Sequence, residues 1–346
     1  MYNEFYKLSG KPFQLSPNPQ FFYGSSGHRK AMSYLQYGLH QGEGFVVVTG
    51  DIGTGKTTLL GHLLAQLDSS KYLAAKLVTT QLEADDTLRM VASAFGIDAR
   101  GLDKATLLRT FERFLLDNQR RGRRILVLVD EVQNLPFKSL EELRMLSNFQ
   151  VNDMAPVQFC LMGQPQFRQM LASDDLMQLR QRVIVSYHLG PLDLEETRSY
   201  IEHRLHLVNW QSDPVLTDGA YRQIHHHTGG VPRRINVLCD RLFLCGMLEE
   251  LHEIGEETVD TVAREMSQEG TSATLDSSPN QSPKKELPTA EEEFTDIEQR
   301  LASVEKVLKV HDRTIRRAIE LAESYFKGKL AATRREPISS APEGQI

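Results

Sequence analysis

A glycine-rich segment that ends in lysine and threonine, GDIGTGKTT at residues 50–58, has the residue types needed to hold phosphate groups. It fits G-x-x-x-x-G-K-[ST], and it lies between a strand-like run at 45–48 and a helix-like run at 59–64. Glycines let the backbone point successive N–H groups at phosphate oxygens, lysine adds a mobile charge, and threonine can coordinate Mg²⁺. The predicted nucleotide contacts are Gly50, Asp51, Gly53, Thr54, Gly55, Lys56, Thr57 and Thr58.

Two adjacent carboxylates follow the apolar run ILVLV at residues 125–129. Asp130, at the end of a buried strand, can hold Mg²⁺ through water together with Thr57, and Glu131 can polarise an attacking water. The alternative is that both carboxylates merely cap a following helix. A metabolic P-loop kinase does not need the second carboxylate, so the pair favours hydrolysis. ATP and Mg²⁺ are therefore the expected cofactors, with Lys56 and Glu131 in catalytic roles.

The elements that must position these residues alternate between strand and helix patterns. Strands are predicted at 45–48, 74–78, 123–131 and 157–165, and helices at 87–95 and 105–118. This order predicts an α/β domain with a mainly parallel sheet, whose strands converge on one ligand-binding edge. From residue 191 the strand signals stop. Helical segments with Asp193 and Thr217 as caps and Gly229-Gly230 as a terminator predict an all-α lid.

The C-terminal part changes in composition. Residues 267–288 are rich in Ser, Pro and charge, which predicts a flexible linker over 267–292. From Phe294 to Tyr325, apolar side chains recur at alternating steps of three and four, which predicts a coiled-coil helix at 293–327. The alternative is an amphipathic helix folded back on the preceding domain. Residues 328–346 are expected to be disordered.

Composition narrows the classes of protein. A net charge of −6 provides no overall basic field that would attract nucleic acid or anionic lipid. No segment approaches the roughly 20 apolar residues needed to span a bilayer, so a soluble, cytoplasmic protein is expected. The three cysteines lack metal-site spacing. The arginine cluster at 119–124 and the three consecutive histidines at 225–227 are interpreted as structural.

Several motifs together resemble a known family. DEVQNLPFKSLEELRMLSNFQ, LMGQPQFRQML, LRQRVIVSYHLGPLDLEETRSYIEHRL and HTGGVPRRINVLCDR, with the opening FYKLSGKPFQLSPNPQFFYGSSGHRKAMSYLQYGL, resemble AAA+ ATPases of the general secretion pathway A (GspA/ExeA) type. Within that family the sequence looks most like the soluble subgroup associated with exosortase and exopolysaccharide genes. The resemblance covers residues 1–266. It implies a P-loop αβα sandwich at 1–190, which includes the N-terminal family segment, and a helical lid at 191–266.

The resemblance also implies roles for residues outside the phosphate loop. Gln164 matches sensor 1, which orients the lytic water; the alternative is a strand-end amide bonded to the neighbouring loop. Arg182 matches an arginine finger that acts on a neighbouring subunit's site, with Arg180 as the competitor and a surface ion pair as the alternative. Arg233 matches sensor 2, the lid arginine that contacts the nucleotide. The N-terminal residues expected over the adenine, unless they simply pack in the core, are Phe13, Pro17 and His28.

By this resemblance we expect a homo-oligomeric ATPase with shared ATP sites, which drives or regulates assembly of an envelope secretion or exopolysaccharide export system. Longer family members carry a transmembrane helix and a peptidoglycan-binding domain after the ATPase. The linker and heptad pattern here instead favour a protein partner, through which the chain associates peripherally with the inner membrane. The alternative is an ATP-dependent DNA-binding regulator similar to MuB, TnsC and TniB, which the acidic balance disfavours and the cluster at 119–124 keeps open.

Overall fold

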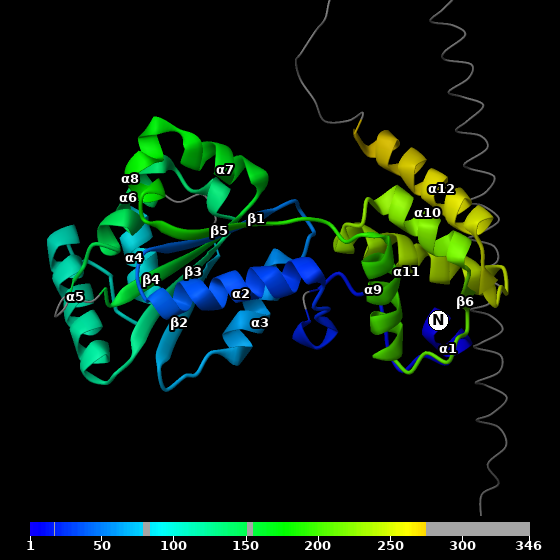
Figure 1. Ribbon diagram of the computed structural model, residues 1–346, viewed down its shortest axis with the longest axis horizontal. Coiled ribbons are helices and arrows are strands. Elements are labelled where there is room, and N and C mark those ends of the chain that lie inside the picture. Colours follow the sequence, from blue (N-terminus) through cyan, green and yellow to red (C-terminus); the bar gives the residue numbers. More distant parts are fainter. Residues whose placement is uncertain (17, 79–83, 151–154, 275–346) are drawn as a thin grey trace, which may run out of the picture. The chain divides into compact units, whose positions relative to one another are not determined.

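The computed structural model describes residues 1–274 apart from 17, 79–83 and 151–154 (Figure 1). The expected coiled coil, the disordered tail and the linker beyond residue 274 lie outside the described residues. Two compact units divide the chain after Asp276, and the first contains all the described elements.

A five-stranded parallel sheet forms the centre of the nucleotide-binding region. Its strands are β1 (Phe45–Gly50), β2 (Tyr72–Val78), β3 (Arg124–Asp130), β4 (Val157–Gly163) and β5 (Val183–Leu189), in the order β2-β3-β4-β1-β5. The four strands predicted from the sequence are confirmed. β5 was missed: it is an edge strand in which only Val185 and Leu189 are buried, and its sequence VIVSYHL includes polar residues.

Helices cover both faces of the sheet, which confirms the expected αβα sandwich (Figure 1). On one face, Val46, Val48, Leu126 and Leu128 pack with apolar residues of α2 (Ser26–Gln41) and α3 (Lys56–Gln66). On the other face, Val47, Val127 and Val129 pack with α4 (Ala84–Ala94), α5 (Lys104–Arg120), α6 (Phe137–Leu146) and α7 (Pro165–Ala172). Alternate residues of each strand therefore supply two separate cores, as a buried parallel strand requires.

The lid contains α9 (Leu194–His206), α10 (Asp218–Thr228), α11 (Pro232–Leu248) and α12 (Glu256–Thr274). The predicted caps are confirmed: Asp193 accepts from the Glu196 N–H, Thr217 accepts from the Ala220 N–H, and Gly229 is left-handed. The expectation of a purely helical lid is corrected, because β6 (Val215–Leu216) and β7 (Glu253–Ile254) form a small parallel pair. Helix α12 also continues past residue 266, where the lid was expected to end.

The N-terminal residues pack with the lid core. Tyr2, in the short helix α1 (Tyr2–Phe5), and then Tyr6 and Phe13 place their rings edge-on to Phe243 of α11, with centroid distances of 5.9, 5.5 and 5.4 Å. The Tyr2 hydroxyl also donates to Asp240. This segment was expected within the nucleotide-binding domain, but its aromatic side chains are buried against lid helices. The chain then passes through the short helix η1 (Pro19–Phe21) into α2.

Candidate nucleotide-binding site

The phosphate loop connects β1 to α3 and requires glycine at several positions. Gly53 and Gly55 have φ values of 86° and 97°, a left-handed conformation that other residues rarely adopt. A Cβ at Gly55 would lie 2.8 Å from His28 Nε2, and one at Gly50 would lie 2.6 Å from the Leu189 carbonyl oxygen. The loop is therefore curled as the motif predicts, and its surroundings leave no room for side chains at these positions.

Lys56 begins α3 and is almost completely buried. Its Nζ donates to the carbonyl oxygens of Gly50 and Asp51, at 2.7 and 2.8 Å. Burial lowers the pKa of Lys56, whereas the charges of Glu131, Asp130 and Asp51 favour the protonated form. The ammonium group is thus held inside the loop, where the backbone curls around the position expected for phosphate oxygens.

Asp130 is 5% exposed and connects three elements. Its Oδ2 accepts from the Thr57 hydroxyl at 3.0 Å and forms an ion pair with Lys76 of β2 at 3.1 Å. Its Oδ1 accepts from the Glu131 N–H at 3.1 Å. Carboxylate and hydroxyl oxygens are the ligands that Mg²⁺ prefers, so Thr57 and Asp130 fit the expected cation. Sequence reasoning missed Lys76, whose only signal is a lysine inside the apolar strand YLAAKLV.

Glu131 has φ 52° and ψ 42°, an uncommon conformation for a residue with a Cβ. Its Oε2 accepts from the Gln133 side chain at 2.6 Å and from Gln164 Nε2 at 3.0 Å. The Gln164 N–H also donates to Gln133 Oε1 at 2.9 Å. Gln164 is therefore a strand-end amide bonded to the neighbouring loop, as one alternative held, and it also touches the carboxylate expected to act on water. Gln133 was not identified from the sequence.

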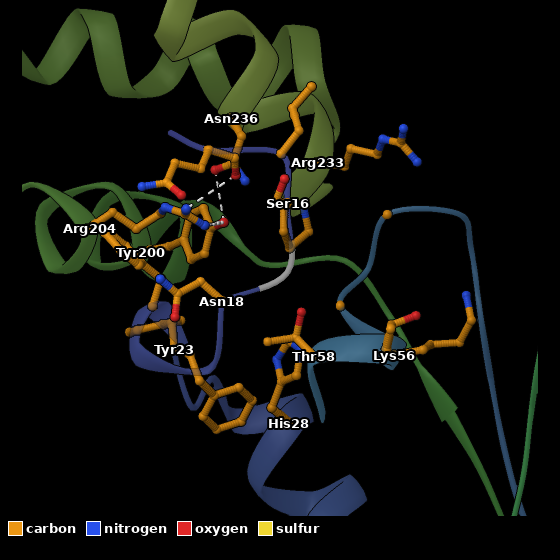
Figure 2. A pocket seen from close by; sticks show the side chains of 18 of the residues that line it. Ser16, Asn18, Tyr23, His28, Lys56, Thr58, Tyr200, Arg204, Arg233 and Asn236 are labelled. Carbon is orange, nitrogen blue, oxygen red and sulfur yellow. Dashed lines mark hydrogen bonds between the residues drawn. The ribbon is translucent and has the colours of Figure 1, made fainter. Parts of the chain in front are cut away.

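A cavity of about 390 Å³ opens beside the loop (Figure 2). Lys56, Thr57, Thr58 and Glu131 line it together with Arg233. Further lining comes from the N-terminal segment and from the lid, namely Gln14, Ser16, Asn18, Phe21, Tyr23, His28, Tyr200, Arg204 and Asn236. This size and mixed lining are typical of small-molecule sites.

The three N-terminal residues expected near the adenine separate in the structure. His28 lines the cavity, and its Nδ1 lies 2.7 Å from the Ser25 hydroxyl. Phe13 is buried against Phe243, which is the core-packing alternative. Pro17 lies outside the described residues. Phe21 and Tyr23, which were not singled out, supply aromatic surface to the cavity instead.

Arg233 lies at the start of α11, directly against the phosphate loop. Its N–H donates to the Gly53 carbonyl oxygen at 3.1 Å, and a Cβ at Gly53 would lie 2.5 Å from Arg233 Cβ. The lid is therefore in contact with the loop through the residue expected as sensor 2. The Arg233 side chain also lines the cavity.

Arg182 immediately precedes β5, and its carbonyl oxygen accepts from the N–H of Phe45, the first residue of β1. The phosphate loop follows the other end of β1, and a six-residue strand spans roughly 17–20 Å. Arg182 is thus at the opposite end of the sheet from its own chain's loop. Its exposed side chain bonds to none of the described residues, whereas Arg180 donates to the Ala172 carbonyl oxygen at 3.1 Å.

The histidines interpreted as structural have protein partners on different elements. His225 Nδ1 lies 3.0 Å from the Thr197 hydroxyl, and His227 Nε2 lies 2.7 Å from Asp260 Oδ1.

Within the described ranges, no helix has the length and apolar character required to cross a membrane.

Comparisons with known proteins show what the chain is similar to. A family model for an AAA domain matches residues 39–171. General secretion pathway protein A of Aeromonas hydrophila is 37% identical over 268 residues, which cover 77% of this chain and 49% of that protein. The chain thus spans about half the length of this curated relative. The exosortase-associated subgroup is not resolved by these matches.

Solved structures share the fold at low sequence identity. The ORC2 protein of Aeropyrum pernix, solved as ADPNP-ADP complexes, is 16% identical with a TM-score of 0.55, over 74% of this chain and 71% of that one. Cdc6p of Pyrobaculum aerophilum is 14% identical with a TM-score of 0.55, over 73% and 70% of the two chains. The motifs and the sheet agree with these comparisons: the chain has the P-loop AAA+ fold, and over 77% of its length it is similar to general secretion pathway protein A.

Proposed function

We propose that this protein hydrolyses ATP to ADP and phosphate. The observation that carries the proposal is the convergence of Lys56, the Thr57–Asp130 pair and Glu131 on one edge of the sheet, beside a cavity of about 390 Å³. The first two fit a triphosphate and its cation, and the third is a carboxylate that could activate water. A nucleotide-binding protein without hydrolysis would need only the first two.

Each residue has a distinct task in this proposal. The loop N–H groups and the Lys56 ammonium bind phosphate oxygens, and Thr57 and Asp130 hold Mg²⁺. When bound, the cation neutralises charge that develops on the phosphate oxygens. Glu131 orients water and accepts its proton, and Gln164 keeps the Glu131 carboxylate in place. Arg233, bonded to the loop through its backbone, couples the lid to the phosphate end of the site.

The proposed active form is a homo-oligomer with shared sites. Arg182 lies about one strand length from its own phosphate loop, and its side chain bonds to none of the described residues, so it suits a role in a neighbouring subunit. Arg180 is less suited, because it already bonds to the end of α7. An arginine finger in this position would add positive charge to the transition state.

The proposed biological role is to drive or regulate assembly of an envelope secretion or exopolysaccharide export system. The support is the similarity to general secretion pathway protein A, which extends over 77% of this chain. The heptad pattern at 293–327 is proposed to recruit a protein partner, joined by a linker to the α/β domain and the lid. The DNA-binding alternative is not favoured, since Drosophila ORC, whose structure was solved bound to DNA, is only 14% identical and shares the fold alone.

Phosphate release from purified full-length protein, with and without double-stranded DNA, tests this proposal. The expected result is Mg²⁺-dependent release from ATP that DNA does not change by more than about twofold. Absence of release under every condition, from protein shown to be folded, would contradict hydrolysis. Strong stimulation by DNA would favour the regulator instead.

A further inference from the structure

Arg204 of α9 is a buried cation with neutral hydrogen-bond partners. It is 6% exposed, and its three donor groups bond to the Pro12 carbonyl oxygen at 2.6 Å, the Tyr200 hydroxyl at 2.8 Å and the Gln14 carbonyl oxygen at 3.3 Å. Its guanidinium also lies over the Phe21 ring, 4.9 Å from the centroid. No carboxylate within the described ranges forms an ion pair with it. Burying a charge without an oppositely charged partner is costly in free energy, which indicates that Arg204 has a role in the cavity that it lines.

The bonds of Arg204 determine the direction of the hydrogen bonds beyond it. A guanidinium can only donate, so the Tyr200 oxygen must accept from it. The single proton of Tyr200 then goes to Asn236 Oδ1, which is 2.9 Å away in a buried bond. Burial raises the pKa of Tyr200, so the phenol keeps this proton. If the Asn236 amide were turned around, that proton would face another donor.

Arg204 therefore fixes the orientation of the Asn236 side-chain amide through Tyr200. Its oxygen is used by Tyr200, and its Nδ2 group remains as the donor end of the side chain. Tyr200, Arg204 and Asn236 all line the cavity, as does Lys56 (Figure 2). In Figure 2 Lys56 lies on one side of the view, and Tyr200 and Arg204 lie on the other, beside Asn18 and Tyr23. A nucleotide whose phosphates reach Lys56 would thus have its base near Asn236.

We propose that Asn236 reads the adenine base of the nucleotide by donating from Nδ2 to a ring nitrogen, and that Arg204 and Tyr200 are positioning residues that fix its polarity. The inference rests on the proposed ATP binding. Adenine suits this end of the cavity because its ring nitrogens N1, N3 and N7 are acceptors. The aromatic side chains of Phe21 and Tyr23 also provide flat apolar surface for the base.

The test compares ligands that differ only at the base, using the full-length wild-type protein. Equilibrium affinities are measured by calorimetry for ATP, inorganic triphosphate and the 1-, 3- and 7-deaza analogues of ATP, each of which replaces one acceptor by C–H. One analogue is expected to bind roughly three- to tenfold more weakly than ATP, the size of one hydrogen bond. Equal affinities for ATP and all three analogues would overturn the proposal. This series needs no variant and cannot be confounded by misfolding.

Variants then assign the contact to Asn236. Asn236→Ala should weaken ATP but not inorganic triphosphate, and it should abolish the discrimination against the one sensitive analogue. Tyr200→Phe should reduce the same discrimination while Asn236 is still present, because nothing then fixes the amide. The exposed Asn148→Ala is the matched control. Equal weakening of ATP and triphosphate by Asn236→Ala would indicate a merely structural role and would contradict the proposal.

The outcomes also separate this inference from the function on which it rests. If the wild-type protein binds neither ATP nor triphosphate, the proposed nucleotide function fails. If both ligands bind and the three deaza analogues have the same affinity as ATP, only the proposed role of Asn236 fails. Asn236→Asp keeps an oxygen for Tyr200 and replaces the donor by an acceptor. It is expected to weaken ATP at least as much as the alanine variant, and an unchanged ATP affinity would contradict the proposal.

Discussion

The side-chain amide of Gln164 donates a 3.0 Å hydrogen bond to the Glu131 carboxylate. This bond joins residues that follow two neighbouring strands, β3 and β4. The same carboxylate oxygen accepts from Gln133 at 2.6 Å. Two donors on one oxygen limit the rotation of the carboxylate, and a group that acts on a bound water must be held in a fixed position.

Removing the Gln164 donor should therefore slow turnover without weakening substrate binding. Gln164→Leu is expected to lower kcat by roughly tenfold, the effect of about 1.4 kcal/mol, and to leave KM within about twofold. Steady-state phosphate release measures both values. Gln166→Leu, at an exposed position of α7, is the control. An unchanged kcat for Gln164→Leu would show that the bond to Glu131 does not contribute to the reaction.

Arg182 should act on the site of a neighbouring subunit. Arg182→Ala and Lys56→Ala chains should each be nearly inactive alone. A co-assembled mixture should recover part of the turnover, since Lys56 of one chain then meets Arg182 of the other. Arg180→Ala is the comparison, expected to act on stability because Arg180 bonds to the end of α7. Activity of the mixture no greater than the sum of its components, with co-assembly demonstrated, would argue against a shared site.

The histidine beside the phosphate loop predicts a pH effect on stability. Burial lowers the pKa of His28, while a bond to the Thr54 backbone and the charge of Glu196 act in the opposite direction. Because the unfolded state binds the proton more readily, the contribution of His28 to stability is complete above pH 6.5 and is lost as pH falls from there toward the folded-state pKa.

Urea unfolding of wild type between pH 8 and pH 5 measures this loss. His28→Gln should show a shallower decline in the free energy of unfolding below pH 6.5, and His40→Gln, at an exposed position of the same helix, should resemble wild type. Parallel pH profiles for His28→Gln and wild type would exclude His28 as the source.

The heptad pattern outside the described residues should act in assembly and not in nucleotide binding. Truncation after Asp276, at the boundary between the two compact units, should leave single-site ATP affinity unchanged and weaken assembly or partner recruitment. A peptide of residues 290–330 should show concentration-dependent helicity, greater at pH 8 than at pH 5, because a charged His311 at a core position is costly. A peptide that stays monomeric and unstructured at high concentration would leave only a partner helix.

Sequence patterns predicted the elements whose signals are local. The phosphate loop, the buried strand that ends at Asp130, and the caps Asp193 and Thr217 each depend on residues close together in the chain. β5 was missed because an edge strand with polar residues lacks the continuous apolar run of a central strand. The lid strands β6 and β7 were missed because each has only two residues, too few to show a recognisable strand pattern.

Contacts between distant segments could not be inferred from the sequence. The Arg204 guanidinium bonds to Pro12, 192 positions earlier in the chain, and this contact joins the N-terminal segment to the lid. Lys76 reaches Asp130 only because β2 and β3 are neighbours in the sheet. Both contacts depend on how the chain folds in three dimensions. Neither Arg204 nor Lys76 belongs to a sequence motif from which its contact residue could be predicted.

The central claim is that Lys56 binds the nucleotide and Glu131 activates water, and it is tested most directly by measuring ATP affinity and phosphate release on the same samples. Lys56→Ala should lose tight ATP binding, because it removes the buried ammonium from the loop. Glu131→Gln should bind ATP within about threefold of wild type and release phosphate at least roughly a hundredfold more slowly. Wild-type turnover by Glu131→Gln, or wild-type ATP affinity of Lys56→Ala, would contradict the account.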